Sequence, residues 1–337
     1  MSLHAMSTTE FSVLPYTDVL AWVVIGVFAL GVLADWRGDR ELARHVTAGA
    51  WALFALFWLL LIHHFALVHR SIVQTVLLVV AVPACLYVGY TLWRGRDSLL
   101  VLSRAVAVMG VIYLPFQMSA WAQGILIEAV ARQSFIVIDT LGFDEIRLEE
   151  SEGEMGGMLT NRFANDVEGV RNTRVVFACT GIESMAMFGG LIAAVRAPLR
   201  RKALGVVVAI SIIWVLNIAR NVFIAVANAY QWFAVSWLES PVMAVFGLSD
   251  PARVSFFVAD RIISQGLAVF ALLGVAWLVS RFVPELLDIV EDLLYLLTGS
   301  EVTLRERTEA VADGGSTGAV ESSQRHESIS SDGSERP

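Results

Sequence analysis

Residues 175–195 read VVFACTGIESMAMFGGLIAAV, and the length and apolar composition of this stretch predict a membrane-spanning helix. The stretch also holds Cys179, Thr180, Glu183 and Ser184, which are polar or ionisable. Ionisable groups are costly in the hydrocarbon core, so their presence there points to a function. Glu183 follows Cys179 by four residues, so one continuous helix would place both side chains on the same face. A thiol in this company, at the water-facing end of a span, is a candidate nucleophile.

The composition of the whole chain indicates that several other stretches are also long and apolar enough to span a membrane. Of the 337 residues, 56% are hydrophobic, and the mean hydropathy is +0.66, far above that of a soluble domain of this size. A membrane helix needs about 20 apolar residues to cross a bilayer. Stretches that meet this requirement lie at about 17–34, 47–68, 72–92, 99–121, 175–195, 203–229 and 254–280. The sequence therefore predicts an all-α polytopic membrane bundle with about seven transmembrane helices.

Basic residues lie in alternate loops between these predicted spans. They are Arg37, Arg40 and Arg44 after the first span, Arg94 and Arg96 after the third, Arg196, Arg200, Arg201 and Lys202 after the fifth, and Arg281 after the seventh. Loops rich in Lys and Arg face the cytoplasm in most membrane proteins. We therefore expect a multi-pass cell-membrane protein with its amino terminus outside and its carboxyl terminus inside.

The balance among the charged residues is unusual. The chain has 24 basic residues, of which Lys202 is the only lysine, and the sequence pI is about 5.3. Acidic surfaces keep proteins soluble in strong brine, which favours a salt-adapted source such as a haloarchaeon. A GC-rich genome would also favour Arg over Lys, so the composition leaves both explanations open.

Two polar segments interrupt or follow the predicted spans. Residues 122–174 begin with a semi-amphipathic stretch and continue as an acidic loop, at about 132–174, which the topology places outside. Residues 284–299 repeat apolar residues at helical spacing with acidic residues between them, which predicts an amphipathic helix on the cytoplasmic surface; an eighth membrane segment is the alternative. The membrane domain is thus expected over 1–299. Residues 300–337 are rich in Ser, Gly, Glu and Arg and are predicted to form a disordered cytoplasmic tail.

Three polar groups fall at one predicted depth. Cys179 lies near the outer start of the fifth span, Arg220 in the outer half of the sixth within NIARN, and Arg261 within VADRIISQG near the outer start of the seventh. Arginine in hydrocarbon costs about 2.5–3.5 kcal/mol on insertion scales, so two of them at this depth need an explanation. A cysteine that attacks a carbonyl provides one, because one guanidinium can lower the pKa of the thiol while the other donates to the oxyanion. These three are therefore the candidate catalytic residues.

Neighbouring polar residues are candidate supporting groups. Asn217 precedes Arg220 by one helical turn, and Ser264 follows Arg261 by one turn, so both can orient the guanidinium groups. Glu183 can pair with either arginine, and since a tight pair would oppose a thiolate, we assign it to positioning. We expect neither a metal site nor a cofactor.

The stretches ACTGIES, NIARN and DRIISQG together resemble the motifs of the exosortase and archaeosortase family of membrane cysteine transpeptidases. That family has a Cys, an Arg within an Asn-x-x-Arg motif, and a third residue that is His in bacterial exosortases. Arg261 stands at the third position in this sequence, which is similar to the archaeosortase branch of haloarchaea. The resemblance covers the core from about the third span to the seventh.

The resemblance implies a substrate class and a reaction that composition and spacing do not show. The partners would be PGF-CTERM-type surface proteins such as surface-layer glycoprotein, whose signal has a Pro-Gly-Phe motif, a transmembrane helix and a basic cytoplasmic end. Cys179 would cleave near that motif in an active site that faces outside. The new carboxyl terminus would pass to a membrane lipid as the acyl acceptor. The resemblance implies no nucleic acid partner.

Other interpretations of the same residues stay open at this stage. Arg220 and Arg261 can be structural, paired with Glu183 and Asp260 inside the bundle of a membrane transporter or anion-binding membrane protein. No chain of polar residues continues from them to the cytoplasm and no internal repeat is evident, which counts against a transporter. Arg253 is the rival of Arg261 for the third motif position.

The remaining cysteine and two histidines are further candidates for this site. Cys85 lies in an apolar run, VPACLYVGY, in the half of the bilayer opposite to Cys179, so no disulfide is expected and packing explains it. His63 and His64 lie at the outer end of the second span, and Cys–His is the commoner nucleophile pairing. A position at the membrane interface, shared with His69, is the explanation that we favour for both histidines.

Overall fold

The computed structural model describes residues 17–63 and 72–298 of the chain. Two compact units divide the chain after Val283, and each is described by itself. The first unit contains the long apolar helices and the candidate site residues. Two expectations, His64 as a catalytic partner and a disordered tail at 300–337, concern residues outside the described ranges.

The first unit is mostly helical. Six helical stretches within the described residues are long and apolar enough to cross a membrane. They are α1 (Thr17–Trp36), α2 (Arg40–His63), α3 (Ile72–Trp93), α4 (Leu100–Met118) with the 3-10 turn η2 (Asp97–Leu99) before it, α7 (Leu199–Ala229), and a continuous stretch that joins η4 (Pro251–Arg253), α9 (Val254–Phe257), the π-helix η5 (Val258–Ser264) and α10 (Gln265–Phe282). The prediction of a polytopic helical membrane protein is confirmed.

The fifth predicted span, 175–195, is not one long helix. Its helical part is α6 (Ile182–Ala194), which has 13 residues, and a separate 3-10 turn, η3 (Phe177–Cys179), precedes it. Gly181 separates the two with a φ of +77°, a left-handed conformation that glycine adopts without strain. Cys179 and Glu183 therefore do not share a helix face, and the i,i+4 relation expected from the sequence is wrong.

Close packing of α6 against α4 depends on glycine. A Cβ atom at Gly190 would lie 2.5 Å from the carbonyl oxygen of Ala105 and 3.0 Å from the amide nitrogen of Met109, so no side chain fits there. A Cβ atom at the adjacent Gly189 would lie 3.4 Å from the side chain of Ile112, which is an ordinary contact. Gly190 thus lets the two backbones approach closely, as small residues do between membrane helices.

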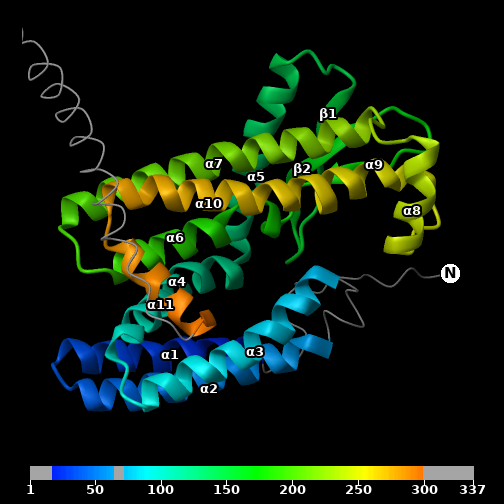
Figure 1. Ribbon diagram of the computed structural model, residues 1–337. Coiled ribbons are helices and arrows are strands. Elements are labelled where there is room, and N and C mark those ends of the chain that lie inside the picture. Colours follow the sequence, from blue (N-terminus) through cyan, green and yellow to red (C-terminus); the bar gives the residue numbers. More distant parts are fainter. Residues whose placement is uncertain (1–16, 64–71, 299–337) are drawn as a thin grey trace, which may run out of the picture. The chain divides into compact units, whose positions relative to one another are not determined.

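Several helix ends meet where the basic loops lie. Arg104 of α4 forms an ion pair with Asp35 of α1 (Nη2–Oδ2 3.2 Å) and donates to the carbonyl of Ala194 at the end of α6 (3.1 Å). Arg44 of α2 forms an ion pair with Asp97, just before α4 (3.5 Å). Figure 1 places the connections from α1 to α2 and from α6 to α7 at this same end of the unit. The basic loops that the positive-inside rule assigned to one side thus share one end.

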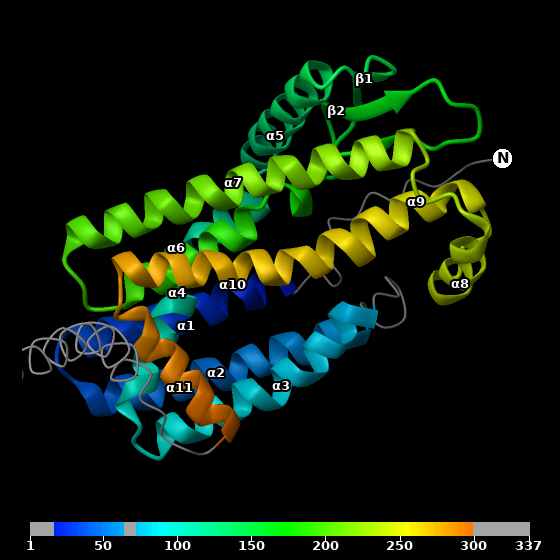
Figure 2. The ribbon, with the colours of Figure 1, turned by 45° about the horizontal axis from the view of Figure 1, so that its top comes forward.

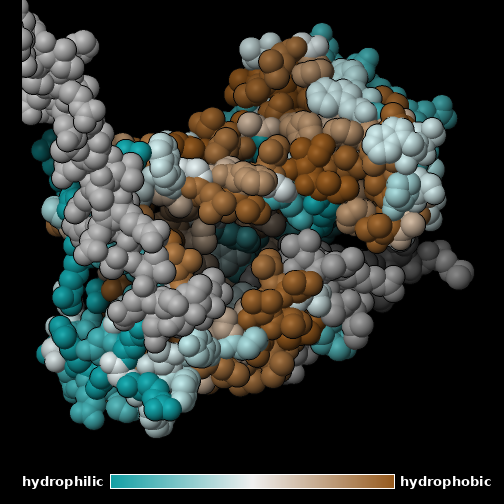
Figure 3. All heavy atoms as spheres, viewed as in Figure 1, coloured by the Kyte–Doolittle hydropathy of each residue, from teal (hydrophilic) through white to brown (hydrophobic). Residues whose placement is uncertain are grey.

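Helices α7 and α10 run side by side in opposite directions (Figures 1 and 2). α7 leaves the basic end at Leu199, and α10 returns to it at Phe282. Arg220 and Arg261 are equally far along the chain from these two ends, which corresponds to about 30 Å at 1.5 Å per residue. On the face that Figure 3 shows, apolar residues predominate along much of this pair, while hydrophilic residues gather around the end of α1 and α2 at the lower left.

The segment between α4 and α6 has more structure than the sequence predicted. It contains α5 (Ala120–Thr140) and a three-stranded antiparallel sheet in the order β1 (Ile146–Glu152), β2 (Met158–Asn165), β3 (Thr173–Arg174). Glu149 lies opposite Arg162 in the register and forms an ion pair with it. The acidic stretch is therefore part of a small sheet rather than an irregular loop, and this sheet accompanies an otherwise helical fold. A further helix, α8 (Ser236–Phe246), follows α7.

The second unit contains α11 (Leu286–Thr298) within the described residues. Asp288, Glu291 and Asp292 alternate with apolar residues along it, and a helix was expected here. The 13 described residues of this helix are fewer than the roughly 20 that a membrane span requires, and the alternative of an eighth membrane segment would extend into residues outside the described ranges.

Candidate active site

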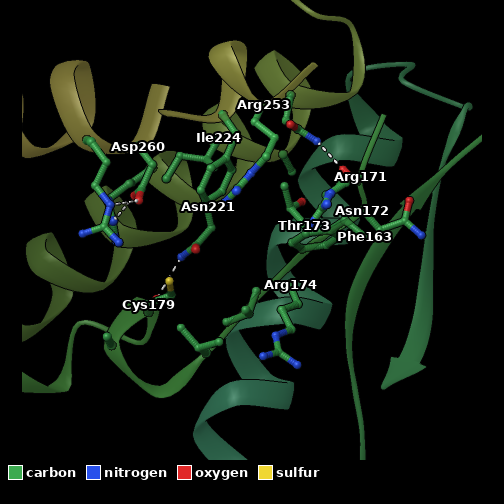
Figure 4. Close-up of a pocket in the computed structure, with 18 of the residues that line it drawn as sticks. Phe163, Arg171, Asn172, Thr173, Arg174, Cys179, Asn221, Ile224, Arg253 and Asp260 are labelled. Atoms are coloured by element: carbon green, nitrogen blue, oxygen red, sulfur yellow. Dashed lines mark hydrogen bonds and ion pairs between the residues drawn. The ribbon is translucent and has the colours of Figure 1, made fainter. Parts of the chain in front are cut away.

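The three candidate catalytic residues line one cavity of about 430 Å³. Cys179 reaches it from the turn before α6, Arg220 from α7, and Arg261 from the π-helix η5. Figure 4 shows Asp260 above Cys179, and a dashed line joins the Asn221 side chain to Cys179. Three segments that are far apart in the sequence thus meet at one cavity. This was expected from the positions of the three residues within their predicted spans.

Asp260 holds both arginines of the site. Its Oδ1 atom lies 2.6 Å from Nη2 of Arg220, and its Oδ2 atom lies 3.3 Å from Nε of Arg261. The Asp260 side chain is 12% exposed, against 25% for Arg220 and 33% for Arg261. One carboxylate therefore fixes two guanidinium groups, and the cluster keeps a net positive charge beside the cavity. The ion pair between these arginines and Asp260 was an alternative interpretation of the sequence, and it is present.

A π-helix presents this cluster. The helix that begins at Pro251 widens at Val258–Ser264, within the motif that contains Asp260 and Arg261. π-helical turns are rare and occur frequently at functional sites, where they displace side chains from their ordinary helical positions. The sequence carries no Gly or Pro inside VADRIIS to mark this turn, so only the structure reveals it.

The NIARN motif holds the backbone of the cysteine. Asn217 and Asn221 lie one turn apart on α7, and their Nδ2 atoms donate to the carbonyl oxygen of Cys179 at 2.7 and 3.0 Å. A Cβ atom on Gly181 would lie 3.1 Å from Cγ of Asn217, so glycine permits this close approach. Asn217 was expected to orient a guanidinium group; the structure instead places its amide on the Cys179 carbonyl. Asn221 was missed, although its spacing of four from Asn217 predicted a shared helix face.

Two opposing effects act on the pKa of the Cys179 thiol. Cys179 precedes the apolar helix α6 and is half-buried. Burial raises the pKa of the thiol above its ordinary value, and the charge of Arg220 acts in the opposite direction. Asp260 and Glu154 add smaller contributions that raise this pKa. Among these influences on the pKa, the positive charge of Arg220 is the largest that favours the thiolate.

The other predicted supporting residues lie outside this cavity. Glu183 is in the first turn of α6, and its Oε1 atom accepts a hydrogen bond from the Tyr113 hydroxyl at 3.2 Å. Ser264 is buried and lines a second, apolar cavity of about 300 Å³ between α6, α7 and α10. Arg220 borders both cavities, so the apolar one adjoins the site.

Three more arginines line the first cavity. Arg171 lies just before β3, Arg174 is the second residue of β3, and Arg253 lies at the start of the last membrane stretch. Arg253 was the rival of Arg261, but its guanidinium lies over the Phe257 ring at 5.1 Å rather than on Asp260. Among the described residues that line the cavity, Asp260 is the only acidic one, so the cavity carries an excess of positive charge. No group of three or more His, Cys, Asp or Glu within the described ranges could hold a metal ion.

Comparison with known proteins decides the family. Residues 17–249 match the model of the transmembrane exosortase family. The chain belongs to this family. The match covers more than half of the chain and includes Cys179 and Arg220, whereas Arg261 lies beyond its end.

Two archaeal relatives extend the relationship over nearly the whole chain. Archaeosortase A of Natronomonas pharaonis is 62% identical over 295 residues, which are 88% of this chain and 93% of that protein. Archaeosortase A of Haloferax volcanii is 48% identical over 299 residues, which are 86% of this chain and 96% of that protein. No solved structure matches the chain. The resemblance inferred from three short motifs is confirmed, and it supports a multi-pass membrane enzyme of the sortase type.

Proposed function

We propose that this exosortase family member is a membrane cysteine transpeptidase. Cys179 is the nucleophile, Arg220 favours its thiolate, and Arg220 and Arg261 donate to the oxygen of the tetrahedral intermediate. The observation that carries the proposal is the meeting of one thiol and two guanidinium groups, oriented by one carboxylate, on a single cavity. Guanidinium groups held before the reaction stabilise developing negative charge without the cost of reorientation.

The reaction proceeds in two displacements. In the first, the Cys179 sulfur forms a bond to a peptide carbonyl carbon, the carbon–nitrogen bond breaks, and the thiol proton ends on the departing amine. In the second, an acceptor hydroxyl attacks the thioester, the carbon–sulfur bond breaks, and the hydroxyl proton restores the thiol. The Asn217 and Asn221 amides keep the Cys179 backbone in place through both steps.

The substrates we propose are surface proteins with a PGF-CTERM-type signal, such as surface-layer glycoprotein, and the acceptor is a membrane lipid. Both archaeal relatives carry the name archaeosortase A, which supports this substrate class. The apolar cavity between α6, α7 and α10 adjoins Arg220 and would accommodate an apolar chain next to the thioester. The role of Glu183 in positioning is proposed through its hydrogen bond from Tyr113, and that of Ser264 through its place next to Gln265, which lines the first cavity.

The site is proposed to face the outside of the cell. The basic loops share one end of the first unit, and the arginines of the site lie about 30 Å from that end along α7 and α10. Because basic loops are cytoplasmic in most membrane proteins, this arrangement supports a cavity on the opposite side of the membrane. A map of accessibility for single cysteines introduced at 145–172 and 196–202, in a chain without native cysteines, checks the orientation.

Replacement of the two native cysteines tests the function. Cells with Cys179→Ala should accumulate unprocessed surface protein with altered gel mobility, whereas cells with Cys85→Ala should resemble the wild type. Cys179→Ser should also be nearly inactive, because guanidinium groups do not activate a hydroxyl of much higher pKa. Normal processing by Cys179→Ala, at normal protein abundance, would exclude the proposed nucleophile.

One alternative function has an observation in its favour. The excess of arginine around the cavity would also suit a membrane protein that binds or transports an anion. Such a protein would not need a thiol. Loss of surface-protein processing in Cys179→Ala, together with unchanged anion uptake into vesicles, would separate the enzyme from the transporter.

A further inference from the structure

The cysteine of the site follows directly from the edge of the small sheet. β3 is the last strand in the order β1-β2-β3, and the chain continues from it in an extended form to the turn that holds Cys179. Val176 has φ −113° and ψ 171°, which is extended backbone. All residues from Thr173 to Val176 line the same cavity as Cys179.

One side of this extended segment is already paired. The Val175 amide donates to the carbonyl of Asn161 at 2.8 Å, and the Val175 carbonyl accepts from Nδ2 of Asn161 at 2.9 Å. The Phe177 amide donates to the carboxylate of Glu154 at 3.2 Å. The segment is therefore held firmly on the side that faces β2.

The other side is open. Backbone groups of successive residues in an antiparallel strand point alternately to its two sides, so the groups of Arg174 point away from β2. The Val176 amide points the same way and has no hydrogen-bond partner in the described part of the chain. The Val176 carbonyl accepts from the Cys179 amide at 2.8 Å. Three groups thus remain for a further strand, namely the Arg174 amide, the Arg174 carbonyl and the Val176 amide.

We infer that the peptide substrate binds as an additional β-strand on the open side of Arg174–Val176, which places its scissile carbonyl at Cys179. An unpaired strand edge is a template for an extended peptide, and main-chain hydrogen bonds supply the affinity in such complexes. The occupant follows from continuity, because this edge and the nucleophile line one cavity. The inference rests on the proposed function and assigns the site that positions the substrate.

The charge around this edge indicates the side chains of that peptide. Arg171, Arg174 and Arg253 line the cavity beside the open side, and Arg174 is exposed. Arg174 and Arg253 form no ion pair with the described residues, while Arg171 has only a long contact of 3.8 Å to Asp250. A strand with an Asp or Glu next to the cleavage site is therefore the preferred substrate.

The test uses short synthetic peptides with a central Pro-Gly-Phe and flanking Asp, Ala and Thr residues. Each non-proline residue is N-methylated in turn, and the Kd of each peptide is measured for the detergent-solubilised Cys179→Ala protein, which binds without turnover. Each lost main-chain hydrogen bond should weaken binding about tenfold. A strand on this edge predicts losses at every second residue on one side of the cleavage site. A flat profile, or equal losses at consecutive residues, would overturn the inference.

Variants of the edge give a second readout. Val176→Pro removes the open amide and should weaken binding about tenfold, whereas Val176→Ala keeps the amide and should bind within about twofold of the parent. A peptide with Asn in place of Asp should bind the Cys179→Ala protein more weakly than the Asp peptide does. The two peptides should bind equally well when Arg174→Gln is added to that protein, and an equal loss of affinity in both proteins would exclude Arg174 as the partner. Equal binding by the Pro and Ala variants, both folded, would contradict strand pairing.

The outcomes separate this inference from the proposed function. If wild-type protein cleaves the parent peptide but the N-methyl profile is flat, the transpeptidase stands and the strand site falls. If the profile alternates but wild-type protein cleaves none of the peptides, the strand site stands and the proposed chemistry falls.

Discussion

The first unit contains two similar ion pairs between membrane helices, one at each end. Near the basic loops, Arg104 pairs with Asp35 at 3.2 Å, and their side chains are 18% and 10% exposed. At the cavity, Arg220 pairs with Asp260 at 2.6 Å, with side chains 25% and 12% exposed. Burial and pairing alone therefore do not distinguish a structural arginine from a functional one.

The surroundings of the two pairs differ. Arg104 has one carboxylate to itself and also donates to the Ala194 carbonyl. Arg220 shares its carboxylate with Arg261, next to a cavity that contains a thiol. In the first pair one guanidinium faces one carboxylate, whereas the second keeps an unbalanced positive charge toward a cavity where a substrate can enter. An unbalanced charge beside a cavity is the feature that indicates a function.

The largest expected effect comes from replacing the arginine of each pair. Arg220→Ala should reduce processing by about 10²–10³, the usual result of losing an oxyanion donor. Its abundance should stay near normal, because Asp260 keeps Arg261 as a partner. Arg220→Lys should fail as well, because it lacks the planar fork. Processing in cells and protein abundance are measured together.

Arg104→Ala is the matched control for that change. It leaves the buried Asp35 carboxylate without its ion-pair partner, which typically costs about 3–5 kcal/mol, so abundance and Tm should fall. The folded protein that remains should process substrate at the normal rate per molecule. If the two variants showed the same pattern, the distinction between the two pairs would be lost.

The next effect concerns the two carboxylates. Asp260→Asn keeps the side-chain volume but releases both guanidinium groups from their positions, and such misplacement costs up to about 10²-fold in rate. Asp35→Asn should lower Tm and leave the rate per folded molecule unchanged. Steady-state cleavage of a signal peptide in proteoliposomes gives the comparison. A normal rate for Asp260→Asn would show that Asp260 does not orient the arginines.

A smaller effect is expected on the thiol itself. Arg220 lowers the pKa of Cys179 against the effect of burial, so Arg220→Ala should raise it further. Alkylation of Cys179 in a Cys85→Ala background should then be slower at each pH and recover at higher pH. Arg104→Ala should leave the alkylation profile unchanged. A profile for Arg220→Ala that coincides with the parent would remove Arg220 from the environment of the thiol.

The smallest effect concerns the packing of α6, which follows the Cys179 turn, against α4, which carries Arg104. Gly190→Ala introduces a Cβ atom 2.5 Å from the Ala105 carbonyl, and overpacking of this kind costs about 1–3 kcal/mol. Gly189→Ala makes only ordinary contact with Ile112 and should be nearly neutral. Thermal unfolding in detergent measures both, and equal Tm values would show that α4 and α6 can separate to admit a side chain.

The sequence predicted the long helices well because each is a nearly continuous apolar run of about membrane thickness. It failed at 175–195, where Gly181 in a left-handed conformation ends an apolar run that composition alone reads as one helix. The sheet was also missed, because acidic residues such as Glu149 suggested a solvated loop. The strands of this sheet pair through residues that are distant in the sequence, such as Glu149 and Arg162.

The candidate site was partly predictable. Cys179, Arg220 and Arg261 could be placed together because the depth of a residue in a membrane helix follows from its position in the span. The sequence did not single out Asp260 as the residue that orients the arginines, and Asn217 was an equally good candidate. The reason is that no residue in VADRIIS marks the π-helix that presents Asp260 to Arg220. The two amides on the Cys179 carbonyl depend on the turn before α6, which the sequence did not predict.

The central claim is that Cys179 forms a thioester with the substrate. The most direct measurement is mass spectrometry of the Cys85→Ala protein after a brief reaction with a PGF-CTERM-type substrate in proteoliposomes. We expect the amino-terminal product to be attached to the peptide that contains Cys179, to be released by hydroxylamine, and to be absent from Cys179→Ala. Formation of the cleaved product without an adduct on Cys179, or continued cleavage by Cys179→Ala, would contradict the mechanism.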